Sequence, residues 1–245
     1  MIWQVRSLAL VSVLAATCVG PVGSSAESGP PPGVYEIYTV NLDGTGLARL
    51  TRNSVGDASP AWSPDGTRIA YVSSEAPEKE TDIYVMNADG TAATRLTDHP
   101  AGEFSPAWSP DGTRILFERY LPNRPRPYEN SEIFVMGADG SDERRLTRNH
   151  LRDFAPQWSP DGTHIAFIRA DGDEQIHVMR ADGTGERPLT DDVSSEPSWS
   201  ADGERLAFVS YGSPELDFEE IHVATADGTG QRPLTDDPGS DLSPA

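Results

Sequence analysis

The sequence predicts an all-β protein built from repeated four-stranded sheets, and three observations support this. A Trp-Ser-Pro-Asp-Gly type of motif followed by a short apolar run occurs four times. An Ile-Tyr-Val-Met-x-Ala-Asp-Gly type of motif followed by a Leu-Thr pair occurs five times and alternates with the first. The repeated tryptophans lie 46, 50 and 41 residues apart, a spacing that fits one four-stranded antiparallel blade of a β-propeller per repeat.

Each repeat contains four short runs of β-branched, aromatic and aliphatic residues, which we assign to strands A to D. Strand A covers Pro-x-Trp-Ser, strand B Ile-Ala-Phe, strand C Ile-Tyr-Val-Met and strand D Arg-Leu-Thr. Asp-Gly pairs join A to B and C to D, because glycine accepts the positive φ of a tight hairpin turn.

One tryptophan and one turn glycine occupy the same place in every full repeat. The tryptophans are Trp62, Trp108, Trp158 and Trp199, and the glycines are Gly66, Gly112, Gly162 and Gly203. We interpret both sets as structural, with each large ring filling the wedge between neighbouring blades.

The repeats and the N-terminus define the expected domain organisation. Residues 1–26 resemble a signal peptide, with one positive side chain, an apolar run and small residues before the cleavage point. Residues 27–33 form a short linker, and residues 34–245 form the propeller. Within it we expect a half-blade at 34–51, full blades at 58–97, 104–147, 154–190 and 195–235, and the start of a broken blade at 236–245.

Composition narrows the classes of partner. The chain has 19 basic and 39 acidic residues and a net charge of −20, so its surface repels nucleic acid and anionic lipid. No run after the signal is long and apolar enough for membrane insertion. Cys18, the only cysteine, lies inside the signal peptide and should be removed with it. The alternative is that Cys18 is a lipidation site. We expect an exported protein, periplasmic or extracellular.

The combined repeat resembles that of TolB-type propellers, over nearly the whole mature chain. This resemblance implies a six-bladed ring, as in TolB itself and in the propeller lids of prolyl-oligopeptidase-like serine peptidases. The sequence supplies about four and a half blades. We therefore expect an incomplete six-bladed ring, which is either a fragment of a longer propeller or an open arc that closes by self-association. A compact ring of fewer blades is the alternative.

The sequence shows no catalytic motif. It lacks Gly-x-Ser-x-Gly, His-Glu-x-x-His, a phosphate-binding Gly-Lys-Ser/Thr loop and a dinucleotide fingerprint. His177 and His222 occupy the strand C position of Tyr84 and Phe134, so we interpret them as packing residues and not as metal ligands. We predict no catalytic residue and no obligatory cofactor.

Carboxylates recur five residues before the tryptophans. Asp57, Glu103 and Asp153 hold this place, Asp241 is in the same register, and Ser194 replaces them in the fourth unit. The linkers from strand D to the next strand A should converge on one face around the channel. Facing carboxylates there could bind a cation such as calcium. Alternatively, each caps a local turn or pairs with an arginine.

Residues 119–128 form the longest loop expected between strands B and C. This loop is the only basic, aromatic and proline-rich stretch of an acidic protein. Its candidate partner-binding residues are Arg119, Tyr120, Arg124, Arg126 and Tyr128. Arginine and tyrosine dominate binding hot spots, although a merely solvated loop is the alternative.

These features predict a non-catalytic exported module that binds or scaffolds a protein or peptide. One alternative is the gating propeller of a split or truncated prolyl-oligopeptidase-like serine hydrolase. Another is a sugar-directed lyase or lactonase that uses a metal in the channel.

Overall fold

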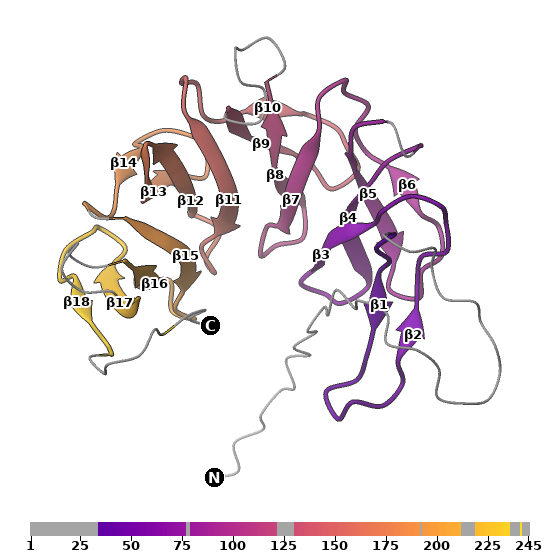
Figure 1. The fold of residues 1–245 in the computed structure, drawn as a ribbon, viewed down its shortest axis with the longest axis horizontal. Coiled ribbons are helices and arrows are strands. Elements are labelled where there is room, and N and C mark those ends of the chain that lie inside the picture. The colour runs from indigo at the N-terminus through magenta and orange to yellow at the C-terminus, as the bar shows by residue number, and fades with distance from the viewer. Residues whose placement is uncertain are drawn as a thin grey trace. The chain divides into compact units, whose positions relative to one another are not determined.

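The computed structural model describes residues 34–76, 79–121, 130–191, 193–211, 219–235 and 241. All regular secondary structure in these residues is β, which confirms the all-β class (Figure 1). They include no helical stretch that could span a lipid bilayer. The expected signal peptide and linker lie outside the described residues. The chain divides into two compact units, Met1–Pro100 and Ala101–Ala245.

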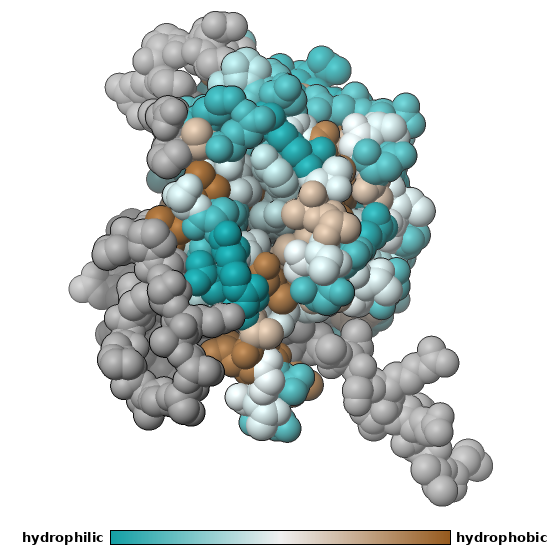
Figure 2. Space-filling view, turned by 90° about the vertical axis from the view of Figure 1, so that its right-hand side faces the viewer, coloured by the Kyte–Doolittle hydropathy of each residue, from teal (hydrophilic) through white to brown (hydrophobic). Residues whose placement is uncertain are grey.

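The first unit contains one half-blade and one full blade. The half-blade is the antiparallel pair β1 (Tyr38–Thr39) and β2 (Ala48–Arg49). Blade I is a four-stranded sheet in chain order, with β3 (Ala58–Trp62), β4 (Arg68–Ser73), β5 (Asp82–Asn87) and β6 (Thr94–Arg95). Teal residues cover most of the described surface that Figure 2 shows, with brown apolar patches between them.

The second unit contains three four-stranded antiparallel sheets, which lie side by side in Figure 1. Blade II comprises β7 (Glu103–Trp108), β8 (Arg114–Tyr120), β9 (Ser131–Gly137) and β10 (Arg144–Arg145). Blade III comprises β11 (Arg152–Trp158), β12 (His164–Asp171), β13 (Asp173–Arg180) and β14 (Arg187–Pro188). Blade IV comprises β15 (Ser194–Trp199), β16 (Arg205–Ser210), β17 (Glu220–Thr225) and β18 (Arg232–Pro233). Each strand pairs with the next along the chain, as the predicted hairpins require.

The Ser-Pro-Asp-Gly segment forms the turn from strand A to strand B. In blade II, the hydroxyl of Ser109 donates to Asp111 Oδ1 at 2.5 Å and accepts the amide of Arg114 at 2.9 Å. The hydrogen bond from Ser109 is the main reason that the pKa of Asp111 falls to about 2. Gly112 has φ 69°, where a side chain would be strained. Strand A therefore ends at the tryptophan, one residue earlier than the sequence suggested.

Strand A contains a β-bulge that sequence reasoning did not predict. The register with strand B shifts between Phe104 and Ala107 in blade II, and at the corresponding place in the other full blades. The bulged residue has a positive φ and precedes a proline each time. These residues are Ser59, Ser105, Ala155 and Glu196, with φ between 50° and 55°. Because proline has no N–H, the bulge leaves one fewer amide to satisfy.

The threonine of each Leu-Thr pair accepts a backbone hydrogen bond through its hydroxyl oxygen. In blade II, Thr147 Oγ1 accepts the backbone N–H of Ile133 at 3.0 Å, and both residues are buried. The same bond, 14 residues apart in sequence, joins Thr51 to Ile37, Thr97 to Ile83, Thr190 to Ile176 and Thr235 to Ile221. The repeated threonine thus satisfies an amide at the start of strand C.

Replacing Thr147 with valine should lower the free energy of unfolding by about 1 to 3 kcal/mol, because the buried N–H of Ile133 loses its acceptor. Urea unfolding measures this change. Thr147→Ser, which keeps the hydroxyl, should retain most of the stability. Equal losses in the two variants would show that the methyl group matters more than the hydrogen bond.

A hydrophobic core joins blades II and III. Leu116, Ile133 and Val135 of blade II contact Trp158, Ile165 and Phe167 of blade III. The indole Nε1 of Trp158 donates to the carbonyl of Ala107 at 3.3 Å, and the guanidinium of Arg114 lies 4.5 Å from the ring centroid. Trp158 therefore fills the space between these two sheets.

A close approach of Leu146 to Gly183 also joins blades II and III. A Cβ added at Gly183 would lie 3.3 Å from both Leu146 Cδ2 and Leu146 O. Gly183 and Gly172 share a φ of 87°, but a Cβ at Gly172 would meet nothing within 4 Å.

We expect Gly183→Ala to lower the free energy of unfolding by about 2 kcal/mol and Gly172→Ala by about 1 kcal/mol. Both variants carry the cost of a positive φ, and only the first adds crowding against Leu146. Thermal and urea unfolding of the two variants give the comparison. Losses of the same size would mean that Leu146 moves aside freely.

Candidate functional site

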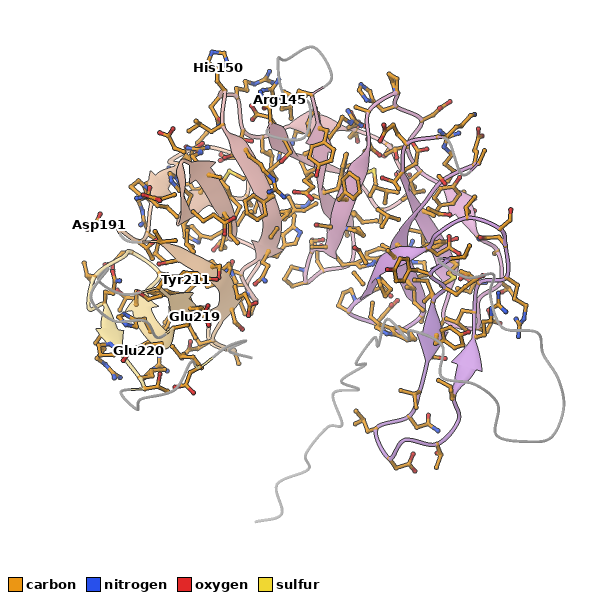
Figure 3. The ribbon with its side chains drawn as sticks, in the orientation of Figure 1. Arg145, His150, Asp191, Tyr211, Glu219 and Glu220 are labelled. Carbon is orange, nitrogen blue, oxygen red and sulfur yellow. The ribbon has the colours of Figure 1, made fainter. Side chains whose placement is uncertain are left out.

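The loop end of the second unit is the end of its sheets at which the B-to-C loops and the D-to-A linkers lie. Figure 3 labels His150 and Asp191 on two of these linkers. It also labels Tyr211 and Glu219, which flank the B-to-C loop of blade IV, and Glu220 at the start of β17. Tyr211 is 39% exposed, and its hydroxyl lies 3.0 Å from Ser195 Oγ. This end therefore presents polar and aromatic groups on short segments held by the sheets.

Two of the predicted channel carboxylates are buried against arginines of strand B. Glu103 accepts Arg119 Nε at 2.6 Å. Asp153 accepts Arg169 Nε at 2.7 Å and Nη2 at 2.8 Å, and it also accepts Asn149 Nδ2 at 2.7 Å. Both carboxylates are fully buried. Their contacts correspond to the alternative in which each carboxylate pairs with an arginine.

The other two predicted carboxylates do not repeat this pair in the described residues, because blade I has Ser73 at the place of Arg119 and Arg169, and Asp241 lies outside the strands. Asp57 is buried and accepts Asn53 Nδ2 at 2.7 Å, and burial raises its pKa. The amide of Asp241 donates to Glu219 O at 2.8 Å. Among the described residues, no three His, Cys, Asp or Glu side chains are grouped to hold a metal ion. Calcium binding stays a prediction, which calcium titration of the purified chain would test.

The predicted partner-binding loop begins later than expected. Arg119 belongs to β8, is only 5% exposed and donates to Glu143 Oε1 and Oε2 at 2.6 and 2.7 Å. The interpretation of Arg119 as a loop residue was therefore wrong, because its guanidinium satisfies carboxylates of its own sheet. Tyr120 ends β8, is half-buried and contacts Phe104, with ring centroids 5.0 Å apart. Arg124, Arg126 and Tyr128 lie outside the described residues.

A second acid–arginine pair recurs between strands C and D and escaped the sequence analysis. Arg145 Nη2 donates to the buried Glu132 at 2.5 Å, and Arg49–Glu36 and Arg95–Asp82 repeat this pair at 2.6 and 2.7 Å. Blades III and IV carry Pro188 and Pro233 in place of the arginine. The constant spacing of 13 residues was the available signal. The pair is structural, since it lies within one sheet.

Glu118 is the buried residue that departs from the repeat. It lies on β8 with 5% exposure, at a place that Val72, Ile168 and Val209 fill in the other blades. Ser105 Oγ donates to its Oε1 at 3.3 Å, whereas Oε2 is buried without a hydrogen-bond partner. Burial raises the pKa of Glu118 to about 7, although Arg152, Ser105 and the amide of Ala155 act to lower it.

Arg152 faces the same region from blade III. Its guanidinium carbon lies 4.1 Å from the ring centroid of Phe154, and its Nε is buried without a partner. Phe104, Tyr120 and Phe154 are each half-buried. We call Glu118, Ser105 and Arg152, with these three aromatic residues, the Glu118 site. It combines a carboxyl that titrates near neutral pH, a guanidinium and aromatic rings. Such groups suit binding, and buried groups of this kind often mark functional sites.

Comparison with known proteins identifies the family that the chain resembles. Residues 125–245 match a family model described as the TolB beta propeller domain. The crystal structure of TolB from Acinetobacter baumannii aligns with a TM-score of 0.66 and 24% identity, over 82% of this chain and 49% of that one.

Two curated relatives match over a single repeat. The Tol-Pal system protein TolB of Actinobacillus succinogenes is 49% identical over 43 residues, which are 18% of this chain and 10% of that protein. Dipeptidyl-peptidase 5 of Porphyromonas gingivalis is 48% identical over 40 residues, 16% of this chain and 6% of that protein. The matched segments thus cover a small part of the curated relatives. The repeat, the sheets and these matches agree: the chain has a TolB-like β-propeller fold, and residues 125–245 match the TolB propeller domain.

Proposed function

We propose that this chain is a non-catalytic exported propeller module that binds a protein or peptide through the loop end of its second unit. The observation that carries the proposal is the Glu118 site, which groups a buried carboxyl and a guanidinium with three half-buried aromatic residues. Aromatic residues and arginine are enriched where protein interfaces derive their binding energy. The similarity to TolB proteins supports the proposal.

The proposal of export rests on residues 1–26. They contain a positive side chain, an apolar run and small residues, in the order found in signal peptides. We propose a periplasmic or extracellular location. Expression of the full gene followed by N-terminal sequencing of the exported product should give Glu27 as the first residue. A product that retains Met1 in the cytosolic fraction would contradict export.

Site-specific photo-crosslinking tests the binding site. A benzoylphenylalanine at Phe154 in the purified full chain should crosslink to one discrete protein in an extract of the host cell envelope. The same probe at Thr163, an exposed residue of the turn at the opposite end of blade III, is the matched control. An adduct at Thr163 but not at Phe154 would place the partner elsewhere, and no adduct at either would contradict protein binding by this unit.

A second candidate function is the gating propeller of a prolyl-oligopeptidase-like serine hydrolase, which the match to dipeptidyl-peptidase 5 favours. The sequence has no Gly-x-Ser-x-Gly motif, so the catalytic serine would lie outside the 245 residues. Hydrolysis of dipeptidyl nitroanilides by the complete natural gene product would support this function and contradict the non-catalytic one.

A further inference from the structure

Glu220, at the start of strand C in blade IV, lacks the arginine that pairs with the same carboxylate in other blades. In the half-blade and in blades I and II, this carboxylate accepts a guanidinium from strand D, with nitrogen–oxygen distances of 2.6, 2.7 and 2.5 Å. Pro233 takes the place of that arginine in blade IV. In blade III, where Pro188 replaces the arginine, Gln175 also replaces the carboxylate. Blade IV therefore keeps the negative charge without its partner.

No other basic side chain within the described part of blade IV replaces the missing arginine. On β16 the residue paired with Glu220 is Ser210, where blade II has an arginine. Arg232 is one position earlier on β18 than the strand D arginine of the other blades, so its side chain lies on the opposite face of the sheet. The sequences of the flanking segments 212–218 and 236–240 contain neither lysine nor arginine.

The Glu220 carboxylate is accessible from solvent, unlike its equivalents. Its side chain is 27% exposed, whereas those of Glu36 and Glu132 are 0% exposed and that of Asp82 is 3% exposed. The nitrogen Nε2 of His222 lies 3.7 Å from Glu220 Oε2, which is beyond hydrogen-bond distance. The arginines of the intact pairs are themselves partly exposed. A guanidinium can therefore reach the corresponding place in blade IV from outside the chain.

The three intact pairs indicate which group suits the open carboxylate. A guanidinium is planar and always charged, and its N–H donors match the two oxygens of a carboxylate. An ammonium group is a more strongly hydrated point charge, and it lacks this flat set of donors. The net charge of −20 also attracts a basic segment of a partner.

We propose that Glu220 binds the guanidinium of an arginine side chain of the peptide or protein partner, in the place that Arg145 occupies against Glu132 in blade II. This inference rests on the proposed function, since it names a residue type that the partner presents to the loop end of the second unit.

Titrating the ¹⁵N-labelled full chain with three small probes tests the site by NMR. N-acetylarginine N-methylamide carries the guanidinium, N-acetyllysine N-methylamide an ammonium, and N-acetylcitrulline N-methylamide a neutral urea of nearly the same shape. The arginine probe should produce saturable shifts of the amide signals of Ser210 and Ile221, with an affinity about tenfold higher than that of the other two. Equal affinity for the lysine or the citrulline probe would overturn the assignment of a guanidinium, and so would the absence of saturation by the arginine probe.

A matched pair of variants locates the binding. Glu220→Gln should weaken binding of the arginine probe about tenfold. Glu219→Gln removes the same charge one residue away and should leave the affinity unchanged. Equal weakening in both variants would mean that the probe responds to the acidic surface in general, and this result would contradict the proposal.

Pro233→Arg supplies the missing arginine within the chain. It should form the ion pair of the other blades and abolish binding of the arginine probe at Glu220. Pro188→Arg, which faces Gln175 in blade III, is the control and should retain binding. A folded Pro233→Arg chain that binds the probe as tightly as the natural chain does would overturn the proposal.

Crosslinking from Phe154 reports on the proposed function separately. An adduct at Phe154 without binding of the arginine probe would contradict only the assignment of Glu220. Probe binding at Glu220 without an adduct at either crosslinking position would contradict the proposed function, so the two failures are distinguishable.

Discussion

Glu118→Ile should raise the free energy of unfolding by about 3 kcal/mol at pH 8. Burial raises the pKa of Glu118 from 4.5 to about 7. The carboxyl of Glu118 therefore binds its proton more tightly in the folded chain than in the unfolded chain. The stability that this provides is fully present below pH 4.5 and is lost as the pH rises through about 7. At pH 8 the folded protein buries an ionised carboxylate, and isoleucine, the residue of blade III at this place, removes that penalty.

Urea unfolding from pH 5 to pH 8 measures the effect. The difference between Glu118→Ile and the natural chain should be small at pH 5 and should grow up to pH 8. Ile168→Val, at the equivalent place in blade III, is the control, and its loss of about 1 kcal/mol should not depend on pH. A variant that is destabilised equally at both pH values would show that Glu118 makes favourable contacts in its ionised form.

Arg169→Met should lower the free energy of unfolding by about 3 to 5 kcal/mol, because it leaves the fully buried Asp153 without its bidentate partner. The double variant Asp153→Ser/Arg169→Ser should lose much less. Blade IV carries Ser194 and Ser210 at the same two places and forms the same sheet. Urea unfolding of the single and double variants gives the comparison.

An exposed pair provides the control for this prediction. Arg205 lies 3.7 Å from Asp202 with both side chains at least half exposed, so Arg205→Met should change stability by less than about 0.5 kcal/mol. If the double variant lost as much stability as Arg169→Met alone, the packing of the arginine side chain would matter more than the unpaired charge.

The sequence predicted the elements whose cause is local. Asp111 and Gly112 specify a turn through their own backbone preferences, and short runs of β-branched, aromatic and aliphatic residues specify the strands on either side. The bulge at Ser105 could not be predicted in this way. A positive φ at a serine has no signature of its own, and it is imposed by the pairing of strands A and B around Pro106.

Predicting the candidate site requires the register in which the strands pair, in addition to the repeat. Glu103 is opposite Arg119 only because strands A and B pair in one register, so the ion pair was left as one of two alternatives. The departure of Glu118 from the repeat could have been recognised from the sequence. Aligning the repeats sets it beside Val72, Ile168 and Val209, but its burial and its unpartnered oxygen need the neighbouring sheet.

The order of strands has a consequence for how such proteins diverge. Every full blade takes its four strands from one uninterrupted stretch of chain, and each pairs with the strand that follows it. A gene segment that encodes one repeat can therefore be duplicated or lost without rethreading any hairpin. Substitutions such as Glu118 can then accumulate in one copy while the others preserve the original pattern, which gives each copy room for a separate role.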